Sequence, residues 1–131
     1  MTNLPWGEIS LNLLRITTGF MFIPHGAQKL FGVLGKEAES IFTLHGAAGP
    51  IEFFGGLMIL FGWYTRPAAF LCSGLMAVAY WITFGYKEVL PIVNKGELAF
   101  VLCFVFFFLW GNGGGDFSID GWLKRRRAAA A

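Results

Sequence analysis

The sequence predicts an all-α integral membrane protein, an antiparallel four-helix bundle with both termini in the cytoplasm. Three observations predict this class. Hydrophobic side chains make up 56% of the 131 residues, only 14% are charged and the mean hydropathy is +0.61, which exceeds what one soluble core can bury. Turn or charged segments divide the apolar residues into four stretches. Basic residues gather on one side of these stretches, which predicts their orientation.

The four apolar stretches cover residues 9–31, 48–63, 67–84 and 97–110. The second and fourth are shorter than the roughly 20 residues that a spanning helix needs, so each taken alone resembles a buried helix of a soluble protein. We expect short or tilted spans, because almost no polar remainder exists to cover them. A single membrane domain then occupies residues 1–131, with a cytoplasmic tail at 111–131. The first stretch has no basic leader and is expected to stay attached to the chain.

Lysine and arginine residues predict the orientation of the bundle. The run from Lys124 to Arg127, and Arg66 in the turn "GWYTRP", should both be cytoplasmic. An even number of spans places the N-terminus on the same side, in a bacterial-type inner membrane. The second and third stretches are joined by a turn so short that they must be antiparallel neighbours. The basic tail is expected to meet anionic lipid rather than nucleic acid.

Polar residues interrupt the apolar pattern near the outer end of the predicted bundle. Three of them lie in the last turns of the first stretch, and two glutamates are expected in the first turns of the second and fourth. An ionisable group turned toward lipid costs about 3 kcal/mol or more, so these groups should face one another. We expect one polar binding site beneath the outer surface. Its predicted residues are His25, Gln28, Lys29, Glu52, Asn94 and Glu97.

Each of these residues also has a purely structural interpretation. Glu52 and Glu97 suit the first turn of a helix, where the macrodipole favours acidic side chains. Lys29 suits a side chain that extends to the lipid headgroups, and His25 suits a hydrogen bond to a carbonyl freed by Pro24. Convergence of a histidine, an amide and an ammonium at one depth favours a binding site, since a helix cap requires none of them.

A second polar group is expected at the inner end of the bundle. Arg15 follows Ile9 by about 9 Å of helical rise, and its expected counter-ions are Asp116 and Asp120 in the glycine-rich segment "GNGGGDFSID". Glycines allow the chain to fold back under the bundle, and an arginine fork suits carboxylates or carbonyls. Together with Arg66, these residues are predicted to form a structural latch.

Three segments of the chain resemble the DoxX family of small four-helix membrane proteins. They are "LLRITTGFMFIPHGAQKLFG", "GPIEFFGGLMILFGWYTRPAA" and "NKGELAFVLCFVFFFLWGNGGGDFSID", which follow in the family's order over most of residues 11–120. The resemblance implies family-pattern positions at Arg15, His25, Lys29, Glu52, Arg66, Glu97 and Asp120. It also implies packing glycines at Gly19, Gly26 and Gly62.

The same resemblance implies a connection with quinone-dependent chemistry. DoxX-like chains form the membrane subunit of a thiosulfate:quinone oxidoreductase and belong to membrane complexes that respond to thiol and oxidative stress. Looser relatives assist the assembly of receptors. A shared fold does not by itself establish a reaction.

The residues themselves limit the chemistry that this chain performs alone. The sequence has no dinucleotide fingerprint, no paired axial histidines and no cysteine pair with exchange spacing, so electrons are expected from a substrate or another subunit. Cys72 and Cys103 lie in apolar runs without neighbouring ligands, which predicts no metal site and no disulfide. We expect His25 and Lys29 to hydrogen-bond a quinone and a nearby carboxylate to take protons.

Three functions are therefore expected, in decreasing order of preference. The first is a membrane subunit of a quinone-linked oxidoreductase, working with a second copy or a redox subunit and without a covalently bound cofactor. The second is a non-catalytic assembly or scaffold protein, in which the polar cluster clamps the helices. The third is a path for small solutes or protons, which a histidine between carboxylates would permit.

Overall fold

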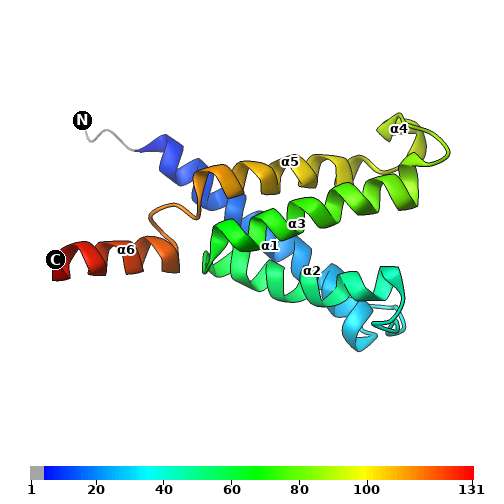
Figure 1. The fold of residues 1–131 in the computed structure, drawn as a ribbon, viewed down its shortest axis with the longest axis horizontal. Helices are drawn as coiled ribbons and strands as arrows, with labels where there is room; N and C mark the ends of the chain where they lie inside the picture. The colour runs from blue at the N-terminus through cyan, green and yellow to red at the C-terminus, as the bar shows by residue number, and fades with distance from the viewer. Residues whose placement is uncertain (1–4) are drawn as a thin grey trace.

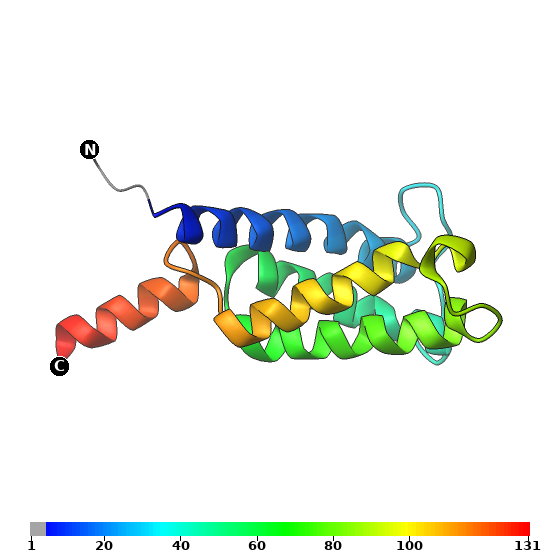
Figure 2. The ribbon, with the colours of Figure 1, turned by 90° about the horizontal axis from the view of Figure 1, so that it is seen from above.

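The computed structural model describes residues 5–131, and these contain helices and turns but no strand. Its long helices are α1 (Trp6–Phe31), α2 (Leu44–Phe61), α3 (Thr65–Ala79) and α5 (Glu97–Asn112). A π-helix, η1 (Tyr80–Gly85), continues α3, a short α4 (Pro91–Asn94) follows, and α6 (Ile119–Ala130) comes last. Figures 1 and 2 show the long helices lying lengthwise beside one another, with α6 and α4 at opposite ends. We call these the α6 end and the α4 end.

Local sequence signals set the limits of α2. The side chain of Thr43 accepts a hydrogen bond from the backbone N of Gly46 and caps the start of the helix. Gly62 ends it in the left-handed conformation, with φ of 67°, which glycine adopts without steric cost. The helix therefore begins earlier than the expected residue 48. Glu52 consequently lies near the middle of α2, so its predicted place in the first turn is wrong.

The long helices pack mainly as two pairs, α1 with α2 and α3 with α5. Glycines bring the backbones of the first pair together. A Cβ added at Gly19 would lie 2.5 Å from the backbone N of Leu60, and one added at Gly26 would lie 2.3 Å from that of Phe53. In the second pair, the hydroxyl of Ser73 donates to the carbonyl of Cys103 at 2.8 Å. Figure 1 shows the two pairs diverging toward the α4 end.

The buried core is narrow and the outside of the molecule is apolar. Phe22, Ile59 and Phe106 are at most 1% exposed and lie in the centre of the core cluster. Phe20 and Phe104, by contrast, are 70% and 60% exposed. Extensive exposed apolar surface is unusual for a soluble monomer and suits contact with lipid.

Two helical segments of the described chain are long and apolar enough to cross a bilayer. They are Leu44–Phe61, with mean hydropathy 1.4, and Thr65–Gly85, with mean hydropathy 1.6. α5 is apolar but has 16 residues, and α1 has 26 residues but carries buried polar side chains, among them Asn12 and Arg15. Length and composition thus support the second and third expected spans.

Candidate functional site

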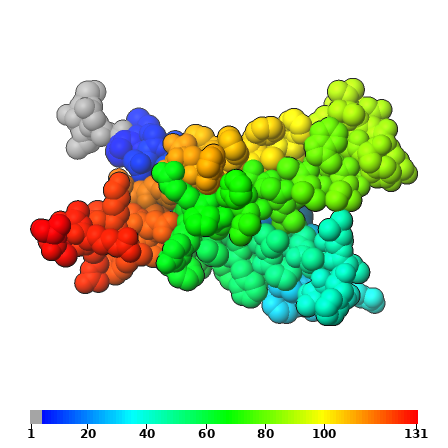
Figure 3. Space-filling model, viewed as in Figure 1, coloured from blue at the N-terminus to red at the C-terminus, as the bar shows by residue number. Residues whose placement is uncertain are grey.

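A cavity of about 480 Å³ lies between the two helix pairs at the α4 end. Figure 3 shows the surface hollowed there, between the region around α4 and the region around the start of α2. Side chains from α1, α2, α3, η1 and α5 line this α4-end cavity. Its apolar wall includes Phe22, Leu75, Met76, Ala79, Ala99 and Leu102. The volume is in the usual range for a small-molecule site.

An ion pair between α1 and α2 lies in the wall of this cavity. The ammonium Nζ of Lys29 donates to Oε1 of Glu52 at 2.7 Å. Glu52 is 4% exposed, and its second oxygen, Oε2, has no hydrogen-bond partner within the described residues. An ammonium has three N–H groups and each carboxylate oxygen accepts hydrogen bonds. Oε2 is closed off from the cavity, whereas the ammonium of Lys29 keeps N–H groups that no described residue accepts, which indicates a polar ligand or water beside it.

Two further predicted residues line the same cavity. His25 is exposed and makes no hydrogen bond within residues 5–131, so the expected bond to a carbonyl beside Pro24 is not formed. The amide of Gln28 donates to the carbonyl of Leu34 at 3.2 Å. The structure thus brings His25, Gln28, Lys29 and Glu52 to one cavity.

Glu97 and Asn94 do not join this group, so their predicted convergence with Lys29 is wrong. Glu97 is exposed in the first turn of α5, and its neighbours Gly96, Leu98 and Ala99 line the cavity in its place. Successive helical residues point about 100° apart, which turns Glu97 away. Asn94 instead donates to the hydroxyl of Tyr80 at 3.0 Å and accepts from the backbone N of Gly96 at 2.7 Å. It joins η1 to the start of α5.

The cavity also includes titratable residues that sequence reasoning did not assign. Oε2 of Glu39 lies 2.6 Å from Nδ1 of His45, and Lys36 and Lys95 lie exposed at the wall. They come from segments 33–47 and 85–96, which lie between the expected apolar stretches. Nothing in their spacing indicates that they share a cavity, because the helix pairs alone bring them together.

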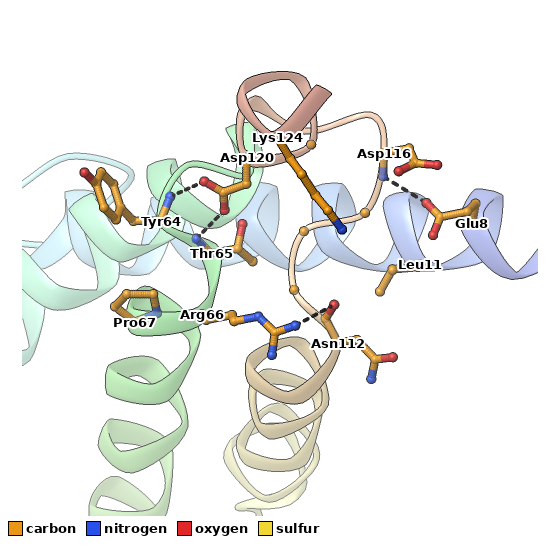
Figure 4. Close-up of a pocket in the computed structure, with 14 residues that line it drawn as sticks. Glu8, Leu11, Tyr64, Thr65, Arg66, Pro67, Asn112, Asp116, Asp120 and Lys124 are labelled. Atoms are coloured by element: carbon orange, nitrogen blue, oxygen red, sulfur yellow. Dashed lines mark hydrogen bonds between the residues drawn. The ribbon is translucent and has the colours of Figure 1, made fainter. Parts of the chain in front are cut away.

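A second, polar cavity of about 410 Å³ lies at the α6 end, and Figure 4 shows the contacts around it. The carboxylate of Asp120 accepts from the backbone N of Tyr64 at 2.9 Å and of Thr65 at 2.8 Å, which caps the start of α3. The guanidinium of Arg66 donates to the carbonyls of Trp110 at 3.0 Å and Gly111 at 2.7 Å. These bonds connect α3 to α5 and α6.

Arg15 is 1% exposed, and its guanidinium binds carbonyls rather than carboxylates. It donates to Gly114 O at 2.8 Å, Ile59 O at 3.0 Å, Leu60 O at 2.5 Å, Phe117 O at 2.9 Å and Asn12 Oδ1 at 3.2 Å. The predicted ion pairs with Asp116 and Asp120 are therefore wrong. The last carbonyls of α2, at the negative end of its macrodipole, take their place. Arg15 still connects α1, α2 and the segment that follows α5.

This fold and site define a class of protein: a small helical protein with lipid-suited outer faces and a partly buried ion pair in an amphiphilic cavity. The DoxX family model matches residues 10–85, and the chain belongs to the DoxX family, whose members are membrane proteins. A protein of Haemophilus influenzae described as uncharacterised is 32% identical over 120 residues, which cover 84% of this chain and 87% of that protein. No solved structure matches the chain.

Proposed function

We propose that this protein is the membrane subunit of a quinone-linked oxidoreductase for sulfur or thiol compounds, and that the α4-end cavity binds the quinone. The observation that carries the proposal is the Lys29–Glu52 pair, whose ammonium has unused N–H donors in the wall of a largely apolar cavity. A ligand with an apolar body and polar oxygens matches both parts of the wall. The family resemblance supplies the choice of a quinone and the link to sulfur.

The chain's own residues would bind and orient this ligand. Leu75, Val78 and Leu98 offer apolar surface to the cavity, and Lys29 has N–H groups free to meet a ligand oxygen. A quinone, when bound, accepts two electrons and two protons. The carboxylate of Glu52 is the cavity's buried group that can hold or pass on a proton. Electrons come from the sulfur or thiol substrate through a partner subunit.

The mouth of the cavity suits entry from the bilayer. Leu44, Val78 and Ile82 line the cavity and are 66%, 49% and 50% exposed. They come from the start of α2 and from the α3–η1 segment, whose hydrogen-bond pattern changes at Tyr80. Such π-helical turns frequently occur at functional sites. A hydrophobic tail would pass between α2 and η1.

The proposal includes four spans across the inner membrane, α1, α2, α3 with η1, and α5, as one domain with both termini in the cytoplasm. Arg66 and the run from Lys124 to Arg127 lie toward the α6 end, which supports its cytoplasmic location. Arg15 is buried, and Lys29 is partly buried and paired with Glu52, which spares both of them contact with lipid. An impermeant thiol reagent should label Lys95→Cys in intact cells and Lys124→Cys only after permeabilisation. The reverse pattern would refute the orientation.

Quinone binding is tested by filling the cavity with a bulky side chain. Ala48 is buried and lines the cavity, whereas its neighbour Ala47 is exposed and does not. We expect quinone to copurify with the wild-type protein and with Ala47→Phe in mild detergent, and to be lost from Ala48→Phe. Added short-chain quinone should bind the first two proteins and not the third. Absence of quinone binding from all three would overturn the proposal.

A scaffold function is the second candidate, and the exposed aromatic side chains of α5 favour it. Phe104, Phe107 and Phe108 are 60%, 53% and 47% exposed and would face lipid, a second copy or another subunit. In a scaffold, Ala48→Phe would leave the recovery of partner proteins unchanged and no quinone would be found. A solute or proton path is less favoured, because buried Phe22 separates Lys29 from Arg15 along α1.

A further inference from the structure

We infer that the mouth of the α4-end cavity binds one anionic phospholipid, with its phosphate group beside Lys36 and Lys95 and an acyl chain against the apolar wall. This lipid site goes beyond the proposed function, because it depends on the charges at the mouth and holds whether or not the cavity takes a quinone. Two observations carry it. Cations without a counter-charge line the cavity, and its apolar wall continues to the outside of the molecule.

The cations that line the cavity outnumber the acids, and both of these acids already have cationic or titratable partners. The ionisable residues of the wall are His25, Lys29, Lys36, Glu39, His45, Glu52 and Lys95. Oε1 of Glu52 lies 2.7 Å from Nζ of Lys29, and Oε2 of Glu39 lies 2.6 Å from Nδ1 of His45. Lys36 and Lys95 are exposed and form no ion pair within residues 5–131. Two ammonium groups at the mouth are therefore left without a counter-charge.

The two lysines come to the cavity from different helix pairs. Lys36 follows α1, which packs with α2, whereas Lys95 directly follows α4 and lies close before α5, which packs with α3. The pairs diverge toward the α4 end (Figure 1), and both lysines line the opening that results. Like charges in the wall of one cavity repel each other, and an anion between them replaces repulsion with attraction. The mouth therefore favours a negatively charged ligand.

The backbone of Lys95 is also unusual for a lysine. It has the left-handed conformation, with φ of 63°, directly after α4. Glycine or asparagine is the usual residue at such a helix end, and residues in this sparsely populated region cluster at functional sites. The position thus carries a cation where local backbone preference favours a smaller, uncharged residue.

The apolar wall indicates that the anion carries a hydrocarbon chain. Leu44, Val78 and Ile82 line the cavity and are exposed, so the wall continues into the surface suited to lipid. An acyl chain can cover this surface and extend into the bilayer, whereas a free phosphate ion would leave it bare. Basic pockets between membrane helices are known to bind anionic lipid headgroups. Charge and apolar surface together favour a phospholipid over a small anion.

The test is native mass spectrometry of the wild-type protein released from neutral detergent micelles. The probes are phosphatidylglycerol and phosphatidylcholine with identical acyl chains, at equal concentrations. Phosphatidylglycerol should occupy the protein at least about tenfold more than phosphatidylcholine. An equal concentration of free glycerol phosphate should not displace it, because the headgroup alone leaves the apolar wall uncovered. Equal occupancy by the two lipids, or displacement by glycerol phosphate, would overturn the inference.

Charge variants assign the bound lipid to the cavity, because residues 124–127 carry further cations at the α6 end. Lys95→Asn removes the ammonium and suits the left-handed backbone, so it should lower phosphatidylglycerol binding about fivefold. Lys87→Asn is the matched control, since Lys87 is exposed and does not line the cavity. It should bind as wild type does. Equal losses from the two variants, or no loss from Lys95→Asn, would overturn the inference.

A second pair of variants tests the apolar wall. Ala48→Phe fills the cavity and should lower phosphatidylglycerol binding, whereas Ala47→Phe, at an exposed neighbour outside the cavity, should leave it unchanged. Unchanged binding in Ala48→Phe would overturn the placement of the acyl chain. Quinone binding by a wild-type protein that shows no lipid preference would overturn this inference alone, and lipid preference without quinone binding would overturn the proposed function alone.

Discussion

Replacing Gly26 with alanine should destabilise the protein by forcing α1 and α2 apart. The added Cβ would lie 2.3 Å from the backbone N of Phe53 and 2.7 Å from the carbonyl oxygen of Gly49. Ordinary contact begins near 3.4 Å, and neither backbone atom can rotate away, so the helices must separate by about 1 Å. Overpacking of this kind costs about 3 kcal/mol. A helix-propensity gain of about 1 kcal/mol offsets part of it, leaving a net loss of about 2 kcal/mol.

The matched control is Gly74→Ala, the same substitution within α3. A Cβ added at Gly74 meets nothing within 4 Å, so only the propensity gain of about 1 kcal/mol applies. Unfolding by denaturing detergent in mixed micelles, followed by circular dichroism, measures both free energies. The two variants should differ by about 3 kcal/mol, with opposite signs relative to wild type. Equal stability of the two would show that α1 and α2 do not pack at this distance, and the site built on their contact would lose its support.

Two further predictions concern the α6 end, and the same unfolding measurement tests them. Arg15→Lys should lose about 3 kcal/mol, because an ammonium cannot replace the five bonds of the buried guanidinium, whereas exposed Arg66→Lys should lose less than about 1 kcal/mol. Asp120→Ala should lose about 1 kcal/mol with the cap of α3, and Asp116→Ala should change the stability by less than about 0.5 kcal/mol. A larger loss from Asp116→Ala than from Asp120→Ala would contradict the contacts described here.

Much of the candidate site could be predicted because it lies on one helix. Gln28 and Lys29 follow His25 by three and four positions within α1. Residues at these spacings are neighbours on a helix surface, so helical periodicity alone places both near His25. Glu52 was predicted for a different reason, since a buried acid in an apolar stretch needs a cationic partner. The pair at 2.7 Å satisfies that need.

The errors arose where rotation about a helix axis or a helix end decided the outcome. Glu97 lies between residues that line the same cavity as Lys29, but the packing of α5 against α3 leaves it exposed. Because Thr43 caps α2, the helix starts at Leu44 and not at the expected residue 48. Glu52 therefore lies in the middle of α2 and not in its first turn. Asp116 and Asp120 were assigned to Arg15 by charge, yet backbone carbonyls at the end of α2 lie closer. Charge complementarity predicts that a partner exists and does not identify it.

The amino-acid sequence by itself determined the helical class, the lipid-suited exterior and the residues that need polar partners, because these depend on local periodicity and on the cost of desolvation. The tertiary structure alone decided that the helix pairs diverge at the α4 end and leave a cavity of about 480 Å³ there. It also decided that Glu52 is left with one unpartnered oxygen. Both features depend on the relative rotation and tilt of helices that are far apart in the chain. Local sequence patterns do not determine that geometry.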